Sequence, residues 1–303
     1  MKDKTLIVIT GPTGVGKTEA TLQIAEHYGI PIINADSRQI FAEIPIGTAA
    51  PTAEQQRRVK HYFVGNHHIE DYYSASLYEQ DALKIIDDSE SKVVLLSGGS
   101  MMYIDAVCKG IDDIPTILPS IREEMKRRLE AEGLQEMCNL LKKLDPEHWE
   151  IVDRNNHRRV IHALEVCLQT GKTYTSFRSD TIKDRPFNII KIGLNRDRDE
   201  LYERINQRVV AMLDAGMVDE TLKVYPKREL NALNTVGYKE LFEYLDGLTT
   251  IDEAIFKIQS NTRRYARKQL TWYKKDVDIK WFHPDNIEEI LKYTRTLLQN
   301  PSK

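Results

Sequence analysis

The 303-residue chain is 41% hydrophobic and 29% charged, with a formal net charge of −3 at pH 7. These values are ordinary for a globular protein, and the near-neutral balance gives no general reason to expect nucleic-acid binding, which would have to come from local clusters. The three cysteines lie far apart without a C-x-x-C pair. This spacing excludes a disulfide framework and a cysteine zinc site, and fits a reducing cytoplasm.

The first apolar run is only five residues long and leads directly into a glycine-rich loop. It is too short for a signal peptide or a membrane span, so we expect a cytosolic protein without membrane contact. Strand-length apolar runs occur at Leu6–Thr10, Pro31–Asn34, Lys92–Ser97 and Asn188–Leu194, and helical patterns at Lys17–Tyr28 and Tyr78–Asp87. The alternation predicts an α/β fold with a parallel sheet covered by helices on both faces.

Residues 116–185 differ from the rest, because they are rich in Glu, Lys, Arg and Leu and carry almost no strand signal. They predict an inserted all-helical lobe, which leaves residues 1–115 and 186–303 to form the catalytic core. From about Asp199 to the end the pattern is again helical, apart from the turn-rich Pro226–Gly237.

The glycine loop reads GPTGVGKT and satisfies the pattern G-x-x-x-x-G-K-[ST], between a predicted strand and a predicted helix. Such a P-loop directs backbone N–H groups and a helix N-terminus at phosphate oxygens. Lys17 would supply a point charge and Thr18 a hydroxyl for Mg²⁺. The predicted phosphate-binding residues are Gly11, Pro12, Thr13, Gly14, Val15, Gly16, Lys17 and Thr18. The pattern predicts a P-loop NTPase-like core that binds a di- or triphosphate, without indicating which bond breaks.

Asp36 stands in the stretch INADSRQIF, at the end of the second apolar run. Four roles fit this pattern: a metal ligand of the Walker-B type, a base for a substrate hydroxyl, a base for an amine, or the N-cap of a helix.

Seven segments in chain order resemble one known family: GPTGVGKT, INADSRQIF, IGTAAPT, SGGSMMY, HRRVIHALEVCLQTGK, NTVGYKE and TRRYARKQLTWYKK. From about Thr5 to Lys275 the chain resembles the bacterial tRNA dimethylallyltransferases. The resemblance implies transfer of a dimethylallyl group from dimethylallyl diphosphate to N6 of adenosine 37 in tRNA. In this reaction the P-loop holds the diphosphate, which is the leaving group.

The resemblance also implies catalytic roles. Asp36 would be the general base, because the adenine nitrogen becomes positive as the C–N bond forms and an ionised carboxylate then suffices to take its proton. Lys17, Thr18 with Mg²⁺, and Arg208 would stabilise the charge that builds on the diphosphate.

The family's tRNA contacts map onto Asp36, Ser37, Arg38, Gln39, Ser100, Arg122, Arg158, Arg159, Val160, Ile161 and His162. Gln39 suits an adenine edge, since an amide can pair bidentately there. Ser100 stands where the family usually has threonine, and His61-Tyr62 where it has two histidines.

The stretch Arg263–Lys275 predicts an amphipathic helix of an unusual kind. At about 100° per residue, six basic residues share one sector: Arg263, Arg264, Arg267, Lys268, Lys274 and Lys275. The remainder, Tyr265, Ala266, Gln269, Leu270, Trp272 and Tyr273, predicts a dry packing side. A cationic stripe of this kind suits an RNA phosphate backbone, and a calmodulin- or membrane-type basic helix is the alternative.

We therefore expect a monomer that binds the tRNA anticodon stem-loop and dimethylallyl diphosphate. Three other readings remain at this point: an adenylate isopentenyltransferase acting on free AMP or ATP, a small-molecule P-loop kinase, and an RNA-binding scaffold. The first two would keep the P-loop but leave the insertion or the basic helix without a role.

Overall fold

The structure is a computed structural model that describes residues 3–179 and 181–299. The chain forms two compact units, Met1–Lys109 with Asp184–Lys303 and Gly110–Lys183. Boundaries at residues 116 and 185 were expected from the sequence. We call the first unit the core and the second the lobe.

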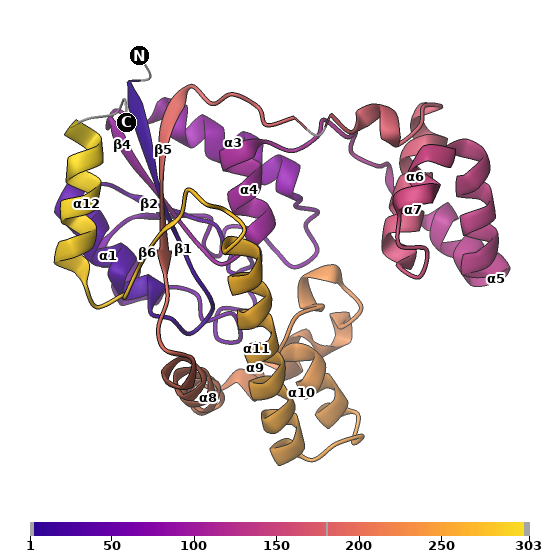
Figure 1. The fold of residues 1–303 in the computed structure, drawn as a ribbon. Helices are drawn as coiled ribbons and strands as arrows, with labels where there is room; N and C mark the ends of the chain where they lie inside the picture. The colour runs from indigo at the N-terminus through magenta and orange to yellow at the C-terminus, as the bar shows by residue number, and fades with distance from the viewer. Residues whose placement is uncertain (1–2, 180, 300–303) are drawn as a thin grey trace. The chain divides into compact units, whose positions relative to one another are not determined.

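A six-stranded parallel sheet forms the centre of the core (Figure 1), in the order β3-β2-β4-β1-β5-β6. The strands are β1 Lys4–Thr10, β2 Ile32–Asn34, β3 His61–Tyr62, β4 Val93–Ser97, β5 Phe187–Leu194 and β6 Lys280–Phe282. The four strands expected from apolar runs are confirmed, and so is the parallel sheet. The expectation of helix alone near the C-terminus was wrong at β6, a three-residue edge strand too short to give a periodic signal.

Helices cover both faces of this sheet. The helices of the core are α1 Lys17–Tyr28, α2 Ala53–Arg58, α3 Ala75–Asp88, α4 Met101–Lys109, α8 Arg198–Asp214, α9 Met217–Val224, α10 Tyr238–Leu245, α11 Ile251–Tyr273 and α12 Ile287–Gln299. Of these, α1 and α12 pack on one face of the sheet and α3 and α4 on the other, while α8, α9, α10 and the first part of α11 form a separate apolar cluster. The predicted helix at Lys17–Tyr28 is confirmed with these bounds, because Gly29 adopts the left-handed conformation that ends a helix. No helix in residues 3–179 and 181–299 is long and apolar enough to cross a membrane.

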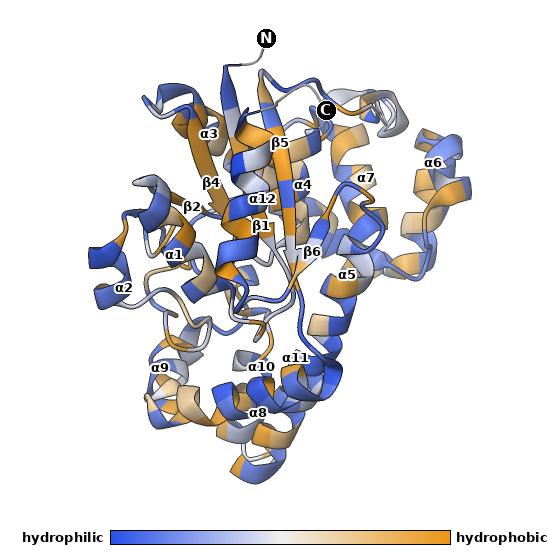
Figure 2. Cartoon of the chain, turned by 60° about the vertical axis from the view of Figure 1, so that its left-hand side comes forward, coloured by the Kyte–Doolittle hydropathy of each residue, from blue (hydrophilic) through white to orange (hydrophobic). Residues whose placement is uncertain are grey.

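The central strands are hydrophobic on both faces, as burial in a parallel sheet requires, and β4 is almost entirely orange in Figure 2. In β1, Leu6 and Val8 join a core that includes residues of α3 and α4. Ile7 and Ile9 point the other way, into a core with residues of α1 and α12. The alternation fixes the register of β1, since a slip by one residue would exchange the two sets.

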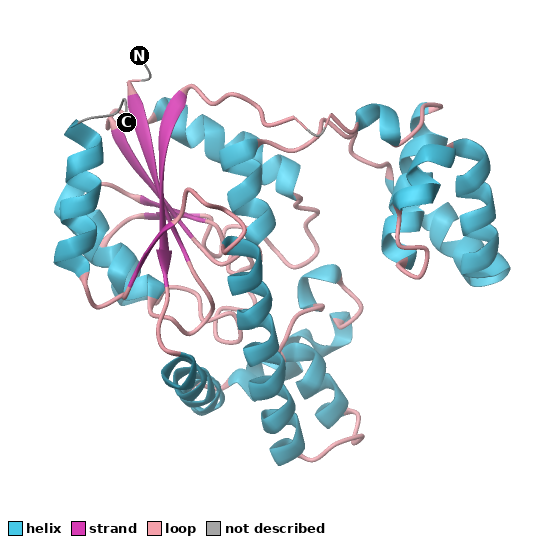
Figure 3. Ribbon diagram, in the orientation of Figure 1, coloured by secondary structure: helices cyan, strands magenta, loops and turns pink. Residues whose placement is uncertain are grey.

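The lobe is built from helices alone in the residues described (Figure 3), as the sequence predicted. They are α5 Pro119–Leu144, α6 Pro146–Ile151 and α7 His157–Thr170. Met125, Leu141 and Leu164 are fully buried in the lobe's own core. Asp145 is also buried there and accepts hydrogen bonds from the backbone N–H groups of His148 and Thr175, at 3.0 and 2.8 Å.

A buried ion pair holds the core together where the chain leaves it for the lobe and returns. Arg185 Nη2 lies 2.5 Å from Glu79 Oε1, and both residues are buried. The same guanidinium donates to the carbonyls of Val107 and Ala106, at 2.9 and 2.6 Å. The departing and returning segments are therefore joined directly by one side chain.

We expect Glu79→Gln to lower the free energy of unfolding by about 3 kcal/mol, because it leaves the buried guanidinium without a counter-charge. Denaturant unfolding of the core would measure the loss. The exposed Glu90 gives a matched control, Glu90→Gln, which should leave the midpoint unchanged. Equal midpoints for the two variants would contradict a structural role for the pair.

Candidate functional site

The P-loop leaves the carboxyl end of the central strand β1 and runs into α1. Gly11 has a φ of +149°, and a Cβ atom there would lie 2.5 Å from the carbonyl oxygen of Leu194. Only glycine lets the loop pass this close to β5. The P-loop and the N-terminus of α1 therefore lie at the carboxyl edge of the sheet, where ligands bind in α/β folds.

Lys17 lies in the first turn of α1 and folds back over the loop. Its Nζ donates to the carbonyls of Gly11 and Pro12, both at 2.9 Å. Burial lowers the pKa of Lys17 to about 7, helped by the positive charge of Arg208 and opposed by Asp36. Near neutral pH the side chain is therefore easily switched between charged and neutral forms.

The neighbouring Thr18 is exposed at the start of α1. No three His, Cys, Asp or Glu side chains gather into a metal-binding group in residues 3–179 and 181–299. A lone hydroxyl beside a phosphate site nevertheless fits Mg²⁺, which keeps several waters and takes its other ligands from substrate phosphates.

Asp36 follows β2 in a turn rather than at the start of a helix. Its Oδ1 accepts from the backbone N–H groups of Arg38 and Gln39, at 2.9 and 3.4 Å. The N-cap hypothesis was therefore wrong about the helix, although one carboxylate oxygen does stabilise the local backbone. The two bonds fix the direction of the carboxylate.

Gly99, after the end of β4, lies between Asp36 and the P-loop lysine. A Cβ atom added at Gly99 would lie 3.8 Å from Lys17 Nζ and 4.0 Å from Asp36 Oδ2. The second carboxylate oxygen of Asp36 and the Lys17 ammonium therefore approach the same small volume. Loops that follow β1, β2 and β4 bring these residues together at one edge of the sheet.

Arg208 completes the cluster from α8. Burial lowers the pKa of its guanidinium, opposed by the negative charge of Asp36. The side chain also lies close enough to Lys17 to shift that pKa. The structure therefore places Arg208 beside Lys17 and Asp36, as the family resemblance implied.

Ser37 and Ser100 brace the Asp36 turn rather than stand free for a ligand. Ser100 Oγ accepts from the Ser37 backbone N–H at 2.8 Å and donates to Ser37 Oγ at 3.0 Å. Ser100 is also buried. The tRNA contact inferred for Ser100 would require these bonds to rearrange, so its hydroxyl acts here through Ser37.

Gln39 is likewise committed within the protein. Its Nε2 donates to the carbonyls of Thr48 and Ala49, both at 3.1 Å. Both amide hydrogens are therefore used. The bidentate pairing with an adenine edge that the sequence indicated needs one of these hydrogens and would break at least one bond, so in this structure Gln39 stabilises the following loop.

The residues of the lobe that the resemblance assigned to tRNA do not all face outward. Arg158 and Arg159 are exposed on the first turn of α7, while Val160 is fully buried in the lobe core. The prediction that Val160 contacts RNA is wrong for its side chain, which packs against its neighbours. Ile161 and His162 are partly buried, and His162 Nδ1 lies 3.4 Å from Glu165 Oε2. Arg122 lies in the first turn of α5 and is also partly buried.

The basic helix is α11, which ends at Tyr273, two residues earlier than predicted. Arg264, Arg267 and Lys268 of the predicted stripe are exposed on the helix, and Lys274 and Lys275 are exposed just past its end. Arg263 is partly buried and donates to Asn206 Oδ1 at 2.6 Å. Arg267 and Lys274 line a cleft of about 660 Å³ with Arg198 and Tyr202 of α8. We call it the basic cleft, because Arg196, Arg198, Arg267 and Lys274 line it together with a single acid, Asp197.

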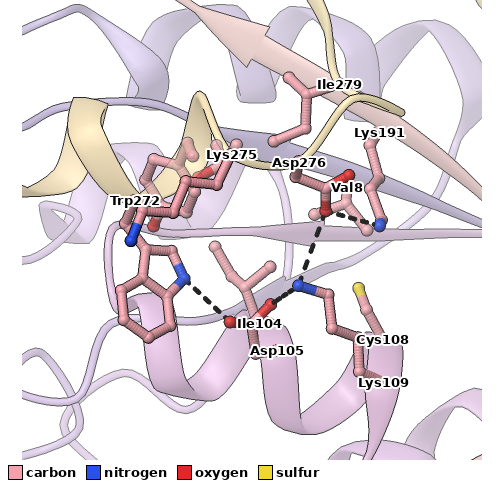
Figure 4. Close-up of a pocket in the computed structure, with 12 residues that line it drawn as sticks. Val8, Ile104, Asp105, Cys108, Lys109, Lys191, Trp272, Lys275, Asp276 and Ile279 are labelled. Carbon is pink, nitrogen blue, oxygen red and sulfur yellow. Dashed lines mark hydrogen bonds and ion pairs between the residues drawn. The ribbon is translucent and has the colours of Figure 1, made fainter. Parts of the chain in front are cut away.

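The sequence predicted more buried residues on the packing side of α11 than the structure shows. Ala266, Gln269 and Tyr273 are buried, but Tyr265 and Trp272 are 37% and 40% exposed. Trp272 instead stands at the rim of a cavity of about 190 Å³ (Figure 4), where its Nε1 donates to Asp105 Oδ2 at 2.8 Å. The cavity walls carry a chain of ion pairs that joins Asp105, Lys109, Asp276 and Lys191.

Gln269 is the site residue that sequence reasoning missed. It is only 1% exposed, and its Oε1 accepts from the P-loop amide of Thr13 at 2.9 Å. A buried glutamine on the apolar side of an amphipathic helix is the signal that could have found it, because a buried amide needs partners.

Comparison with known proteins identifies the family. The IPP transferase family model matches residues 39–276. The tRNA dimethylallyltransferase 1 of Phocaeicola vulgatus is 59% identical over 97% of this chain and 98% of its own length, and that of Bacteroides fragilis 56% identical over 99% and 100%. The crystal structure of the tRNA isopentenylpyrophosphate transferase of Bacillus halodurans is 33% identical, covers 99% of this chain and 98% of its own, and superposes with a TM-score of 0.72. The family model matches most of the chain, and close relatives match nearly all of it. The chain therefore belongs to the IPP transferase family.

Proposed function

We propose that the protein transfers the dimethylallyl group of dimethylallyl diphosphate to N6 of adenosine 37 in tRNA and releases diphosphate. The observation that carries this proposal is the approach of the Asp36 carboxylate and the P-loop Lys17 to one volume beside Gly99. A base and a diphosphate site that are close together suit a displacement in which the nucleophile loses a proton as the diphosphate leaves. The relatives' names support the same reaction.

On the leaving-group side, the P-loop amides and Lys17 bind the diphosphate, and Arg208 adds a second cation. These groups are fixed before the reaction and face the oxygens on which negative charge develops, so they lower the barrier. Thr18 would hold a Mg²⁺ ion, which, when bound, neutralises part of the diphosphate charge.

On the acceptor side, Asp36 removes the proton from N6. The exocyclic nitrogen of adenine is a weak nucleophile, because its lone pair is delocalised into the ring. Its N–H becomes acidic only as the C–N bond forms, so the base must stand beside the reacting atoms at that moment. The bonds from Arg38 and Gln39 hold one carboxylate oxygen of Asp36 and leave Oδ2 on the Gly99 side.

For tRNA, we propose that the exposed stripe of α11 and the basic cleft bind backbone phosphates, and that Arg158 and Arg159 of the lobe contact the anticodon stem-loop. Adenosine 37 must leave its stack to reach Asp36, at a cost of a few kcal/mol. Phosphate contacts, which release counterions, supply affinity to offset it. We expect a monomer that acts in the cytoplasm.

A transfer assay tests the function against its alternatives. Protein, Mg²⁺ and labelled dimethylallyl diphosphate are offered hypomodified tRNA in one reaction and AMP in another, and ATP turnover is followed in a third. Label on tRNA alone is expected. Label on AMP would indicate an adenylate isopentenyltransferase, and ATP consumption without prenyl transfer would indicate a kinase.

Binding of inorganic pyrophosphate should weaken as pH rises through 7. In the free protein the pKa of Lys17 is about 7, and bound pyrophosphate favours the ammonium, so binding takes up a proton. Linkage then predicts that affinity falls about fivefold between pH 7 and pH 8.

The control for this prediction is Lys17→Arg, whose guanidinium stays charged at both pH values. Titration calorimetry on the two proteins removes the ionisation of pyrophosphate itself from the comparison. If the wild type and Lys17→Arg had the same pH dependence, the lowered pKa of Lys17 would be refuted.

A further inference from the structure

Gln269 connects two loops that come from distant parts of the chain. Its Oε1 accepts from the Thr13 backbone N–H at 2.9 Å, and its Nε2 donates to the Gly99 carbonyl at 2.8 Å. The side chain is 1% exposed, so these two bonds are made away from water. One amide group therefore joins the P-loop to the segment after β4.

The segment after β4 packs closely against the Gln269 side chain at Gly99. A Cβ atom at Gly99 would lie only 2.7 Å from Gln269 Nε2. The Gly99 carbonyl also accepts from Tyr273 Oη at 3.1 Å, one turn further along α11. Two side chains of one helix thus fix the position of this carbonyl.

The second loop leads directly to the base. Ser100, the next residue, bonds through its hydroxyl to the backbone and the hydroxyl of Ser37. Its own N–H donates to the Ala35 carbonyl at 3.1 Å. Ala35 and Ser37 flank Asp36, so the chain of bonds runs from Thr13 through Gln269, Gly99 and Ser100 to the base.

We propose that Gln269 is a positioning residue that fixes the leaving-group loop against the loop that carries the base. This role rests on the function proposed above. Gln269 touches neither substrate, because its side chain is enclosed by the two loops. It acts by setting the separation between the diphosphate site and Asp36, on which a displacement with proton removal depends.

A buried glutamine could also be no more than a satisfied polar group in the core. Two features separate the roles. The bonds reach two different loops, each of which carries a reacting group, and α11 carries on its exposed face the basic stripe proposed for tRNA. If Gln269 were purely structural, replacing it would lower stability without lowering kcat more than it weakens the binding of the substrates.

The first test replaces the amide by an apolar group of similar size. For Gln269→Leu we expect kcat for tRNA to fall about 10²-fold, as misplacement by about 1 Å can cause, while KM for tRNA and the affinity for pyrophosphate stay within a few-fold of the wild type. The matched control is Gln259→Leu on the same helix, where the amide donates to the Asn206 carbonyl of α8 at 3.4 Å rather than to the P-loop or the segment after β4. This control should keep the wild-type kcat.

The second test is Gln269→Glu, which keeps the shape of the side chain. When ionised, the new carboxylate repels the Gly99 carbonyl, and when protonated its O–H donates to that carbonyl as the amide does. The kcat of Gln269→Glu relative to the wild type should therefore rise several-fold as pH falls from 8 to 6. This measurement also serves if Gln269→Leu folds poorly.

Three results would overturn the role. Gln269→Leu could match Gln259→Leu in kcat, or, at an unchanged melting temperature, lose affinity for tRNA and pyrophosphate as strongly as it loses kcat, or Gln269→Glu could keep a constant ratio to the wild type across pH. A wild-type protein that transferred no label to tRNA in the same assay would instead overturn the proposed function, and the role of Gln269 with it.

Discussion

Asp36→Asn should slow prenylation of tRNA to a single-turnover rate about 10²- to 10⁴-fold below the wild type, the range for loss of a general base. Asparagine keeps the side-chain oxygen that accepts from Arg38 and Gln39, so the turn should survive. It cannot take a proton from N6. The loss is therefore chemical, and saturating substrate should not restore the rate.

Pyrophosphate binding by Asp36→Asn serves as a control only at a pH where Lys17 stays charged in both proteins. Asp36 raises the pKa of Lys17, so its neutralisation favours uncharged Lys17 and weakens pyrophosphate binding near pH 7 for an indirect reason. At pH 6 the variant should bind pyrophosphate almost as the wild type does. Asp81→Asn, at an exposed acid of α3, should transfer normally. A near-normal rate for Asp36→Asn would remove Asp36 from its role as base.

Lys17→Met should reduce kcat/KM for dimethylallyl diphosphate by about 10²- to 10³-fold, comparable to loss of one strong donor to a developing anion. Methionine keeps the length and much of the apolar stem of lysine but removes the charge and the Nζ donors. Unlike Asp36→Asn, this variant should also bind pyrophosphate poorly. Steady-state kinetics together with calorimetry would therefore separate the leaving-group defect from the base defect.

The reference for Lys17→Met is Lys84→Met, at an exposed lysine of α3 in the same core. Its kinetics should be those of the wild type. If Lys17→Met kept both kcat/KM and pyrophosphate affinity, the P-loop would not be the diphosphate site, and Arg208 would have to be tested as the main cation.

Several parts of this fold could be predicted because their signals are local. The strands of the sheet centre are continuous apolar runs, and the P-loop has a fixed pattern between a strand and a helix. The residues of β3 and β6 could not be predicted, since two or three residues give no periodicity and their pairing depends on a neighbour distant in the chain.

The site was predicted unevenly for a similar reason. A single sequence can indicate which residue types carry chemistry, as at Lys17 and Asp36. It cannot indicate whether a polar side chain is already used inside the protein. Gln39 and Ser100 looked like ligand contacts but bond to their own chain, while Gln269 looked like packing and joins two loops. Such long-range hydrogen bonds leave no local pattern.

The buried Arg185, in the core just after the lobe's last residue in sequence, has a thermodynamic consequence. By bonding to the carbonyls of Ala106 and Val107 it pins together the two ends of the segment Gly110–Lys183. If the lobe melted, the core would only have to close a flexible loop, whose entropic cost grows with the logarithm of its length and amounts to a few kcal/mol. The core can therefore stay folded after the lobe has melted. Heating should then give two calorimetric transitions in place of one.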